Sequence, residues 1–204
     1  MMCAARDTPG LLLEPPSGGS FRFDPGALCL ELLPTGGPGG LAAYEVLHDP
    51  PALLRWIADS RLPAGLRLPV DDAEVAAARE LRNALWGLAG ARAHGADAPA
   101  ADVVVVNAAA AAPALVARIG ARGAREWAPD ATVSQLLSTV ARDAVELFTG
   151  AYAHRVRECG SHDCRLLFVD TSRPGRRRWC SMERCGNRSK VRAHRARHSE
   201  ADEQ

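Results

Sequence analysis

The chain has 204 residues, of which 47% are hydrophobic and 24% are charged, and its formal net charge is +1. This balance excludes a chain that is disordered throughout. The sequence contains no run of 18 apolar residues, so no membrane-spanning helix is predicted. The first residues lack the apolar core of a signal peptide, so we expect a cytoplasmic protein. The basic side chains are 24 Arg and one Lys, a bias typical of GC-rich bacterial genes.

The charges are unevenly distributed along the chain. Residues 152–198 contain 13 basic and 4 acidic side chains, whereas residues 1–151 contain 12 basic and 17 acidic ones. Three more acids lie in the tail, residues 199–204. This division predicts two modules with different partners, and the basic module is a candidate for binding nucleic acid. It also predicts that residues 20–150 fold without the basic module.

The N-terminal part begins with a segment that favours loops. Residues 1–20 are rich in Pro, Gly and Ser, which predicts a flexible leader. The apolar residues between positions 21 and 33 indicate a strand or a short helix, and the sequence PTGGPGG at 34–40 indicates a loop. A mostly helical module, residues 21–151, is therefore expected to follow the leader.

Helix signals are clear in the rest of this module. Asp49 is a predicted N-cap, with two prolines suited to the first turn behind it. Residues 71–94 combine acids at the start with apolar residues at helical spacing, and Gly95 is a natural stop. Residues 132–152 have the pattern of a second long amphipathic helix.

Two segments between these helices are harder to assign. In residues 100–113, the run Val103–Val106 favours a strand, whereas Asp102 as a cap and the alanines that follow favour a helix. Residues 115–119 and 124–127 are predicted to form a small hairpin, because a glycine-containing turn separates them.

Four of the six cysteines form two pairs with the same spacing. Cys159 and Cys164 enclose four residues, Cys180 and Cys185 also enclose four, and 15 residues separate the pairs. In an intracellular protein such pairs indicate metal ligands before disulfides. Four thiolates complete the tetrahedral shell of Zn²⁺ and leave no position for water, which predicts one structural zinc. Two disulfides or four free thiols are the alternative.

The segment between the cysteine pairs has the pattern of a hairpin. Leu166–Val169 is a predicted strand, Arg173–Arg176 a turn, and Arg177–Cys180 the returning strand. A helix is expected from Ser181 onward. The predicted fold is therefore mainly α with a small β-hairpin: a helical N-terminal domain plus a C-terminal treble-clef-like zinc finger, residues 152–198.

The run CGSHDCRLLFVDTSRPGRRRWCSMERCGNRSKVRAHRARH resembles the CGNR zinc finger. The resemblance is carried by Cys185–Arg188, which spells the motif, by Leu167–Ser172, by Arg178–Met182 and by Lys190. It implies a zinc finger of a kind that normally follows a domain described as a stress-induced transcription regulator.

A weaker resemblance to that regulator domain covers roughly residues 20–150. Leu28–Leu33 lies where the domain has a segment of the type Leu-Asp-Phe-Val-Asn-Thr, and the helix that contains Asn107 is also similar. The Asn of that segment is absent, and Pro34–Thr35 replaces the expected residues. The resemblance implies transcriptional regulation.

Basic side chains flank Cys180 and Cys185 on both sides. On a helix, three arginines of the last segment share one face while Lys190 lies on the opposite face. A helix in a DNA major groove can use both faces, because phosphates line it on each side. The alternative is a solvated, Arg-rich helix without a partner. The candidate nucleic-acid contacts are Arg176, Arg177, Arg178, Arg188, Lys190, Arg192, Arg195 and Arg197.

No catalytic motif is evident, since the chain lacks a phosphate-binding loop, a nucleophile elbow and a paired His on a helix. We therefore expect a DNA-binding transcriptional regulator rather than an enzyme. Its helical domain would sense a small ligand or a protein partner, and a homodimer would lengthen the short footprint of one finger. The alternatives are a protein–protein interaction module with a purely structural finger, and an RNA-associated protein.

Overall fold

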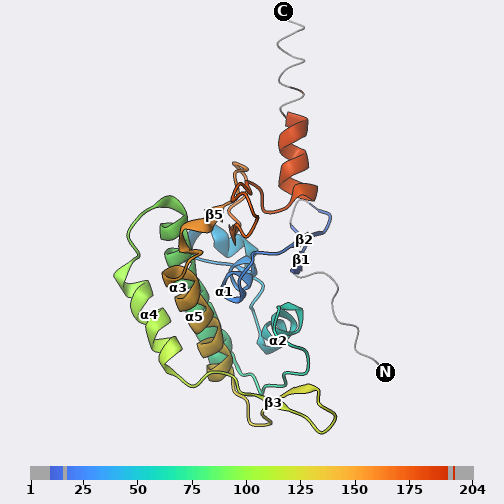
Figure 1. Cartoon of the computed structure of the whole chain (residues 1–204), viewed down its shortest axis with the longest axis vertical. Helices are drawn as coiled ribbons and strands as arrows, with labels where there is room; N and C mark the ends of the chain where they lie inside the picture. Colours follow the sequence, from blue (N-terminus) through green and yellow to red (C-terminus); the bar gives the residue numbers. More distant parts are fainter. Residues whose placement is uncertain (1–9, 16–17, 193–194, 196–204) are drawn as a thin grey trace, which may run out of the picture.

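Three long helices packed side by side form the centre of the molecule (Figure 1). This computed structural model describes residues 10–15, 18–192 and 195. The helices are α1 (Leu28–Glu31), α2 (Pro50–Asp59), α3 (Asp72–His94), α4 (Ala100–Ala111) and α5 (Val133–Thr149), with shorter turns η1 (Leu33–Thr35), η2 (Gly39–Tyr44), η3 (Ala153–Arg155) and η4 (Met182–Gly186). The central three are α3, α4 and α5, while α1 lies against α5 and α2 lies against α3. Residues 187–192 are helical and project from the finger.

Local capping explains where the long helices begin and end. Asp71 caps α3 in a reciprocal capping box with Glu74, and Thr132 caps α5 in the same way. The Asp49 carboxylate accepts a hydrogen bond from the Ala52 amide at 2.8 Å, as expected for the cap of α2. Helix α3 ends at Gly95 in the left-handed conformation. These helix predictions are confirmed.

The ambiguous valine-rich segment is helix α4. Its N-cap is Pro99, so Asp102 lies in the first turn and the prediction that it is the cap is wrong. Burial of Val106 in the helical core overrides the strand preference of the valine run. Helices α3 and α4 approach closely at Gly87, where an added Cβ would lie 1.7 Å from Oδ2 of Asp102.

The strands of the described residues form three separate antiparallel hairpins. They are β1 (Leu11–Leu13), β2 (Phe21–Phe23), β3 (Ala117–Ile119), β4 (Arg125–Trp127), β5 (Val156–Glu158) and β6 (Leu167–Val169). The pair β3–β4 confirms the predicted hairpin. The pair β1–β2 departs from the expected flexible leader, because Leu11 is buried and Leu13 packs against the apolar residues around the cysteines.

The prediction of a hairpin between the cysteine pairs is wrong, because its first strand pairs with a different segment. Strand β6 pairs with β5, which precedes Cys159, and residues 177–180 form no strand. A turn is present one residue earlier than expected, over residues 172–175, with the Gly175 amide 3.0 Å from the Ser172 carbonyl oxygen. The Arg177 amide donates to the buried Asp170 carboxylate at 2.8 Å instead of to a strand. The Asp170 carboxylate therefore directs residues 177–180 toward the cysteines instead of along β6.

Strand β6 is shared by the two hydrophobic cores. Leu167 and Val169 belong to the large cluster formed with the helices, as does Val156 of β5. Phe168 belongs to the small cluster that contains the four paired cysteines. Successive side chains of a strand point to opposite faces, so one strand serves both domains. The helical domain is thus completed by residues of the finger, and its independent folding remains a prediction.

None of the helices in the described residues combines the length and apolarity needed to span a membrane.

Candidate metal centre and basic surface

The four paired cysteines lie together at one point of the finger. Their sulfur atoms are all within 4.8 Å of one another, and three of the side chains are buried. The Sγ atoms of Cys164 and Cys180 are 3.8 Å apart, and those of Cys180 and Cys185 are 3.5 Å apart. A tetrahedral zinc–thiolate site with Zn–S bonds of about 2.3 Å has sulfur–sulfur edges of about 3.8 Å. The four sulfurs can hold one zinc ion.

Local structure places each sulfur. Cys159 directly follows β5, Cys164 ends a tight turn before β6, and Cys185 lies in η4. The backbone amide of Cys180 donates a hydrogen bond to the Cys159 sulfur at 3.3 Å, which favours a charged sulfur there. No disulfide joins the described cysteines, so the disulfide alternative is not what the structure contains.

The acid–base behaviour of the cluster also fits a cation. Hydrogen bonds from the Cys164 and Cys180 thiols lower the pKa of Cys159 to about 2, while the same contact with Cys159 raises the pKa of Cys164 to about 12. The pKa of Cys180 is also raised, chiefly by its contact with Cys159. Neighbouring sulfurs therefore resist ionising together. A divalent cation removes this resistance, because it neutralises thiolates that otherwise repel each other.

Arg177, one of the predicted nucleic-acid contacts, points inward beside this cluster. Its guanidinium donates to the Cys180 carbonyl oxygen at 2.6 Å and to the Asp24 carbonyl oxygen at 3.1 Å. It also lies over the Phe168 ring, 4.1 Å from the ring centre. The side chain thus joins the second cysteine pair to the segment after β2, and it has an internal role.

Asp170 fixes the turn on which Arg177 lies. The carboxylate is buried and accepts hydrogen bonds from the Ser172 amide, the Ser172 hydroxyl and the Arg177 amide. Burial alone opposes the charged form, but these hydrogen bonds outweigh it and lower the pKa of Asp170. Asp170 therefore holds the basic turn as a charged group.

A second acid, Asp163, ties the first cysteine pair to the last helix. Its carboxylate accepts from Arg188, and from Arg192 at 3.2 Å. Arg192 also contacts Nδ1 of His162 at 2.9 Å. The Ser161 hydroxyl and these two arginines hold the pKa of Asp163 at about 2. Two of the predicted nucleic-acid contacts are therefore already engaged within the finger.

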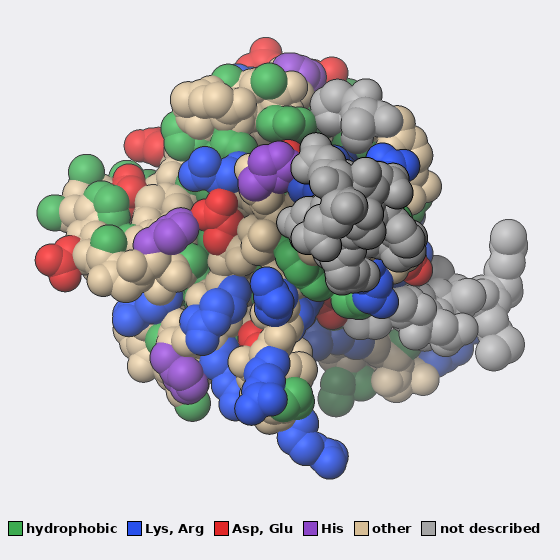
Figure 2. Space-filling model, turned by 90° about the horizontal axis from the view of Figure 1, so that it is seen from above, with side chains coloured by type: hydrophobic (Ala, Val, Ile, Leu, Met, Phe, Trp, Pro, Cys, Tyr) green, Lys and Arg blue, Asp and Glu red, His purple; other side chains and the backbone are tan. Residues whose placement is uncertain are grey.

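Most of the other predicted nucleic-acid contacts are exposed to solvent. Seen from the finger end, Figure 2 shows Lys and Arg side chains gathered on one face. Arg188 is half-buried, and Arg197 lies outside the described residues. In the sequence, nothing distinguishes Arg177 from the arginines on either side of it, so its internal role could not be predicted. Asp163 could have been recognised as an ion-pair partner, because it is an acid within a basic segment. The exposed members of the predicted set are Arg176, Arg178, Lys190, Arg192 and Arg195.

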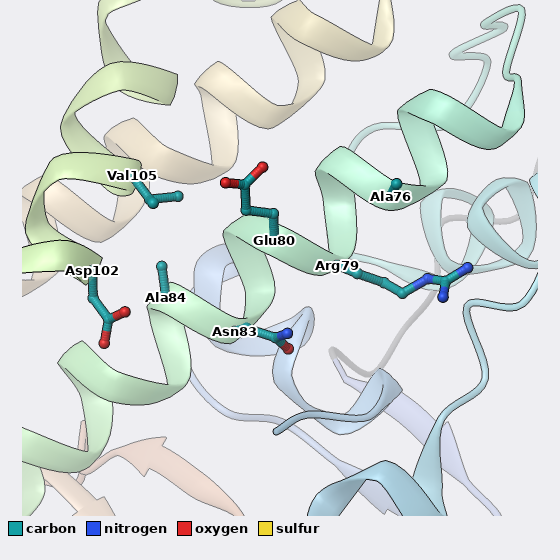
Figure 3. Close-up of a pocket in the computed structure, with 7 residues that line it drawn as sticks. All are labelled: Ala76, Arg79, Glu80, Asn83, Ala84, Asp102 and Val105. Carbon is teal, nitrogen blue, oxygen red and sulfur yellow. The ribbon is translucent and has the colours of Figure 1, made fainter. Parts of the chain in front are cut away.

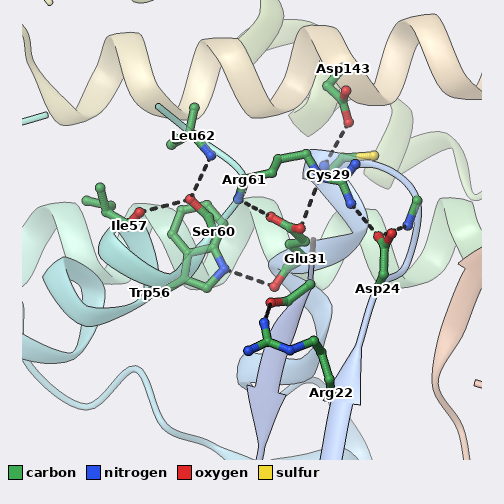
Figure 4. Close-up of polar contacts among 12 residues, drawn as sticks. Arg22, Asp24, Cys29, Glu31, Trp56, Ile57, Ser60, Arg61, Leu62 and Asp143 are labelled. Atoms are coloured by element: carbon green, nitrogen blue, oxygen red, sulfur yellow. Dashed lines mark hydrogen bonds and ion pairs between the residues drawn. The ribbon is translucent and has the colours of Figure 1, made fainter. Parts of the chain in front are cut away.

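A polar network joins the segment after β2 to α1 and to the residues that follow α2 (Figure 4). Arg61 donates to the buried Glu31 carboxylate and pairs with Asp24 at 2.8 Å. Burial raises the pKa of Glu31 although Arg61 opposes this rise. Because the Asp24 backbone also accepts from Arg177, a continuous chain of contacts runs from α1 to the cysteine cluster. Cys29, next to this network, is a buried thiol.

Several polar side chains line a hollow between α3 and α4, but they do not point toward one common position (Figure 3). Arg79 points away from Asp102 and Glu80. The hollow measures about 460 Å³, and burial raises the pKa of Asp102. A ligand site needs polar groups that converge, so this hollow is no candidate.

Two family models match the chain. Residues 26–151 match the ABATE model, described as "Putative stress-induced transcription regulator". Residues 155–198 match the CGNR zinc finger model. Both resemblances inferred from the sequence are confirmed. No curated protein matches the chain.

Proposed function

We propose, from the premise that the chain belongs to the ABATE family and carries a CGNR zinc finger, that it is a DNA-binding transcriptional regulator. In this proposal the finger contacts DNA and the helical domain senses a small ligand or a protein partner. The protein binds rather than catalyses. A homodimer on DNA would lengthen the short footprint of a single finger.

The observation that carries this proposal is the exposed basic surface on a zinc-binding scaffold. Arg176 and Arg178 flank Arg177, whose amide Asp170 holds, while Lys190 lies on the last helix, residues 187–192, and Arg195 is a further exposed arginine. A rigid scaffold orients guanidinium groups at low entropic cost, and such groups suit bidentate contacts to phosphate or guanine.

The cysteines support a cytoplasmic location in this proposal. Cys29 and the four paired cysteines are free of disulfides. Reducing conditions keep thiols available for zinc, whereas an oxidising compartment favours their pairing.

Duplex DNA binding by the zinc-loaded chain, followed by fluorescence anisotropy over a salt series, tests the proposal. Each phosphate contact contributes a log–log slope of about −0.9. Arg176→Ala with Arg178→Ala should weaken binding and flatten the slope by about one unit for each phosphate that the variant no longer neutralises. The matched control is Arg118→Ala with Arg122→Ala, which removes the same charge from the exposed β3–β4 hairpin.

Two results contradict DNA binding. Equal losses in the finger variant and the hairpin control would mean that only net charge matters, which favours a protein-binding module. Tighter binding to a single-stranded RNA of matched length than to duplex DNA would favour the RNA-associated alternative.

A further inference from the structure

The last helix, residues 187–192, projects from the finger and has two different sides (Figure 1). On one side, Arg188 and Arg192 lie one turn apart, and both engage the Asp163 carboxylate. On the other side lie three exposed residues at spacings of three and four, which we call the outer face: Asn187, Lys190 and Val191. The two ion pairs therefore turn the outer face away from the segment that carries Asp163.

Two members of the outer face have little to hold them within the finger. The Asn187 amide nitrogen lies 3.4 Å from the Glu183 carbonyl oxygen, at the long end of the hydrogen-bond range, and its side chain has no other hydrogen bond among the described residues. Val191 is 49% exposed and belongs to neither hydrophobic cluster. One exposed valine carries no meaning by itself, but this one adjoins an exposed amide.

Cations flank this uncharged pair on both sides. Successive residues of an α-helix are about 100° apart around its axis, so Asn187 and Val191 lie within about 40° of each other. Lys190 lies on one side of the pair, about 60° from Asn187. Arg188 lies on the other side, about 60° from Val191. The helix thus presents an uncharged strip between two basic ones.

This order of side chains matches a helix that lies in the major groove of DNA. The phosphates of the two strands form the walls of the groove, where cations bind, and the base edges form its floor. The amide of Asn forms two hydrogen bonds with adenine, and an apolar side chain contacts the methyl group of thymine. The surplus of 13 basic over 4 acidic residues in 152–198 complements the charge of the duplex.

We propose that the outer face reads base sequence, with Asn187 forming a bidentate pair with an adenine and Val191 packing against the methyl group of a thymine. Residues four apart on a helix are about 5–6 Å apart and base pairs about 3.4 Å, so the two bases lie within two base pairs of each other. Lys190 and Arg188 then neutralise phosphates on either side. The inference rests on the proposed function, because it names the feature of DNA that the finger recognises.

Selection from a pool of duplexes with a random core tests this assignment. The zinc-loaded full chain binds the pool, and the bound duplexes are sequenced. We expect the wild type to enrich duplexes that contain an adenine and a thymine within two base pairs. Asn187→Ala should reduce the preference for that adenine by about tenfold. The salt slope of binding should stay unchanged, because an amide neutralises no phosphate.

The matched control is Asn107→Ala, which removes an exposed amide from α4 and should change neither the base preference nor the salt slope.

Two further variants separate base reading from a structural role. Asn187→Asp should move the preference at that position from adenine to cytosine, because a carboxylate accepts a hydrogen bond from the cytosine amino group. Val191→Ser should reduce the preference for the thymine by about fourfold and leave the preference for adenine unchanged. Zinc content should be the same in all variants, because none replaces a cysteine of the cluster.

A bracing role of Asn187 at the start of the helix predicts a different result. Loss of the amide would then weaken binding to all duplexes alike and speed the loss of zinc to a chelator, with the base preferences unchanged. That result would overturn the proposal. Duplex binding without any base preference in the wild type would also overturn it and leave the proposed function intact, whereas absence of duplex binding would overturn both.

Discussion

The helical domain and the finger are stabilised by different means. Helices α3, α4 and α5 bury a large apolar cluster, of the kind that generally stabilises a domain of ordinary size without a metal. The cluster around the cysteines buries three phenylalanines, two of them from β2, which is too little for independent stability. A short module remains ordered when a metal site lies on one face of a strand and a neighbouring core lies on the other. Strand β6 has this position.

Loss of one ligand should produce the largest effect. Replacing Cys180 with Ser is expected to release zinc and unfold the finger, because binding energy of the metal is folding energy in so small a core. Zinc content by elemental analysis and the helical signal by circular dichroism measure the two events. Most of the helical signal should remain.

Cys29 provides the matched control for this experiment. It is a buried free thiol outside the cluster, so Cys29→Ala should retain a full equivalent of zinc. Retention of zinc by Cys180→Ser, or its absence from the wild-type protein, would show that the four sulfurs are not the metal site.

The shared strand offers the next largest effect. Leu167 is buried in the helical core although it lies in the finger, so Leu167→Ala should cost about 2–5 kcal/mol of unfolding free energy. Chemical denaturation followed by the helical signal measures this cost. Val104→Ala, an exposed site on α4, should change the midpoint little.

A chain that ends at Gly150 extends this test. It lacks Val156, Leu167 and Val169, which complete the helical core. We expect it to melt at a lower temperature than the full chain. Equal stability of the truncated and full chains would mean that the two cores are independent after all.

A smaller effect should separate Arg177 from its two neighbours. Arg177→Gln removes charged hydrogen bonds to the Cys180 and Asp24 carbonyl oxygens, each worth roughly 1.5–3 kcal/mol in general. We expect faster loss of zinc to a chelator. Arg176→Gln and Arg178→Gln should keep the wild-type rate, because both side chains are exposed. Identical rates of zinc loss in all three variants would show that Arg177 does not brace the metal site.

The sequence predicted those features that depend on neighbours along the chain. The Asp49 cap and the apolar periodicity of residues 71–94 and 132–152 locate three helices, because both signals involve only near neighbours along the chain. The cysteine spacing locates the metal site for the same reason, since a short turn brings two sulfurs to one ion. Both kinds of signal are local, and both are confirmed.

Long-range choices could not be predicted in this way. The partner of β6 depends on burial of Leu167 and Val169 against helices far away in sequence, so β5 was missed. One signal was present, because an unbroken apolar run such as Leu166–Val169 is typical of a strand covered on both faces. The inward orientation of the Arg177 side chain depends on the Asp170 carboxylate. This carboxylate accepts the Arg177 amide hydrogen that strand pairing would otherwise use.

The smallest expected effect concerns Asp163, where the basic surface is partly neutralised by the finger itself. Its carboxylate engages Arg188 and Arg192, which the sequence indicated as nucleic-acid contacts. Asp163→Asn should free both arginines, raise DNA affinity a few-fold and steepen the salt slope by up to about two units. Zinc content should stay unchanged, because Asp163 is not among the four clustered cysteines.

The control for Asp163 is Asp130→Asn, which removes the same charge from an exposed position of the helical domain. Equal changes in the two variants would mean that net charge alone is responsible. The pH dependence has a defined sign, because the pKa of Asp163 is about 2 and the ordinary value is about 3.9. The ion pairs therefore stabilise the last helix above about pH 4, and this stabilisation disappears as the pH falls toward 2. Asp163 is therefore fully charged at about pH 6–8, where the thiolates keep zinc, and the gain in DNA affinity of Asp163→Asn over the wild type, measured by anisotropy, should be the same across this range.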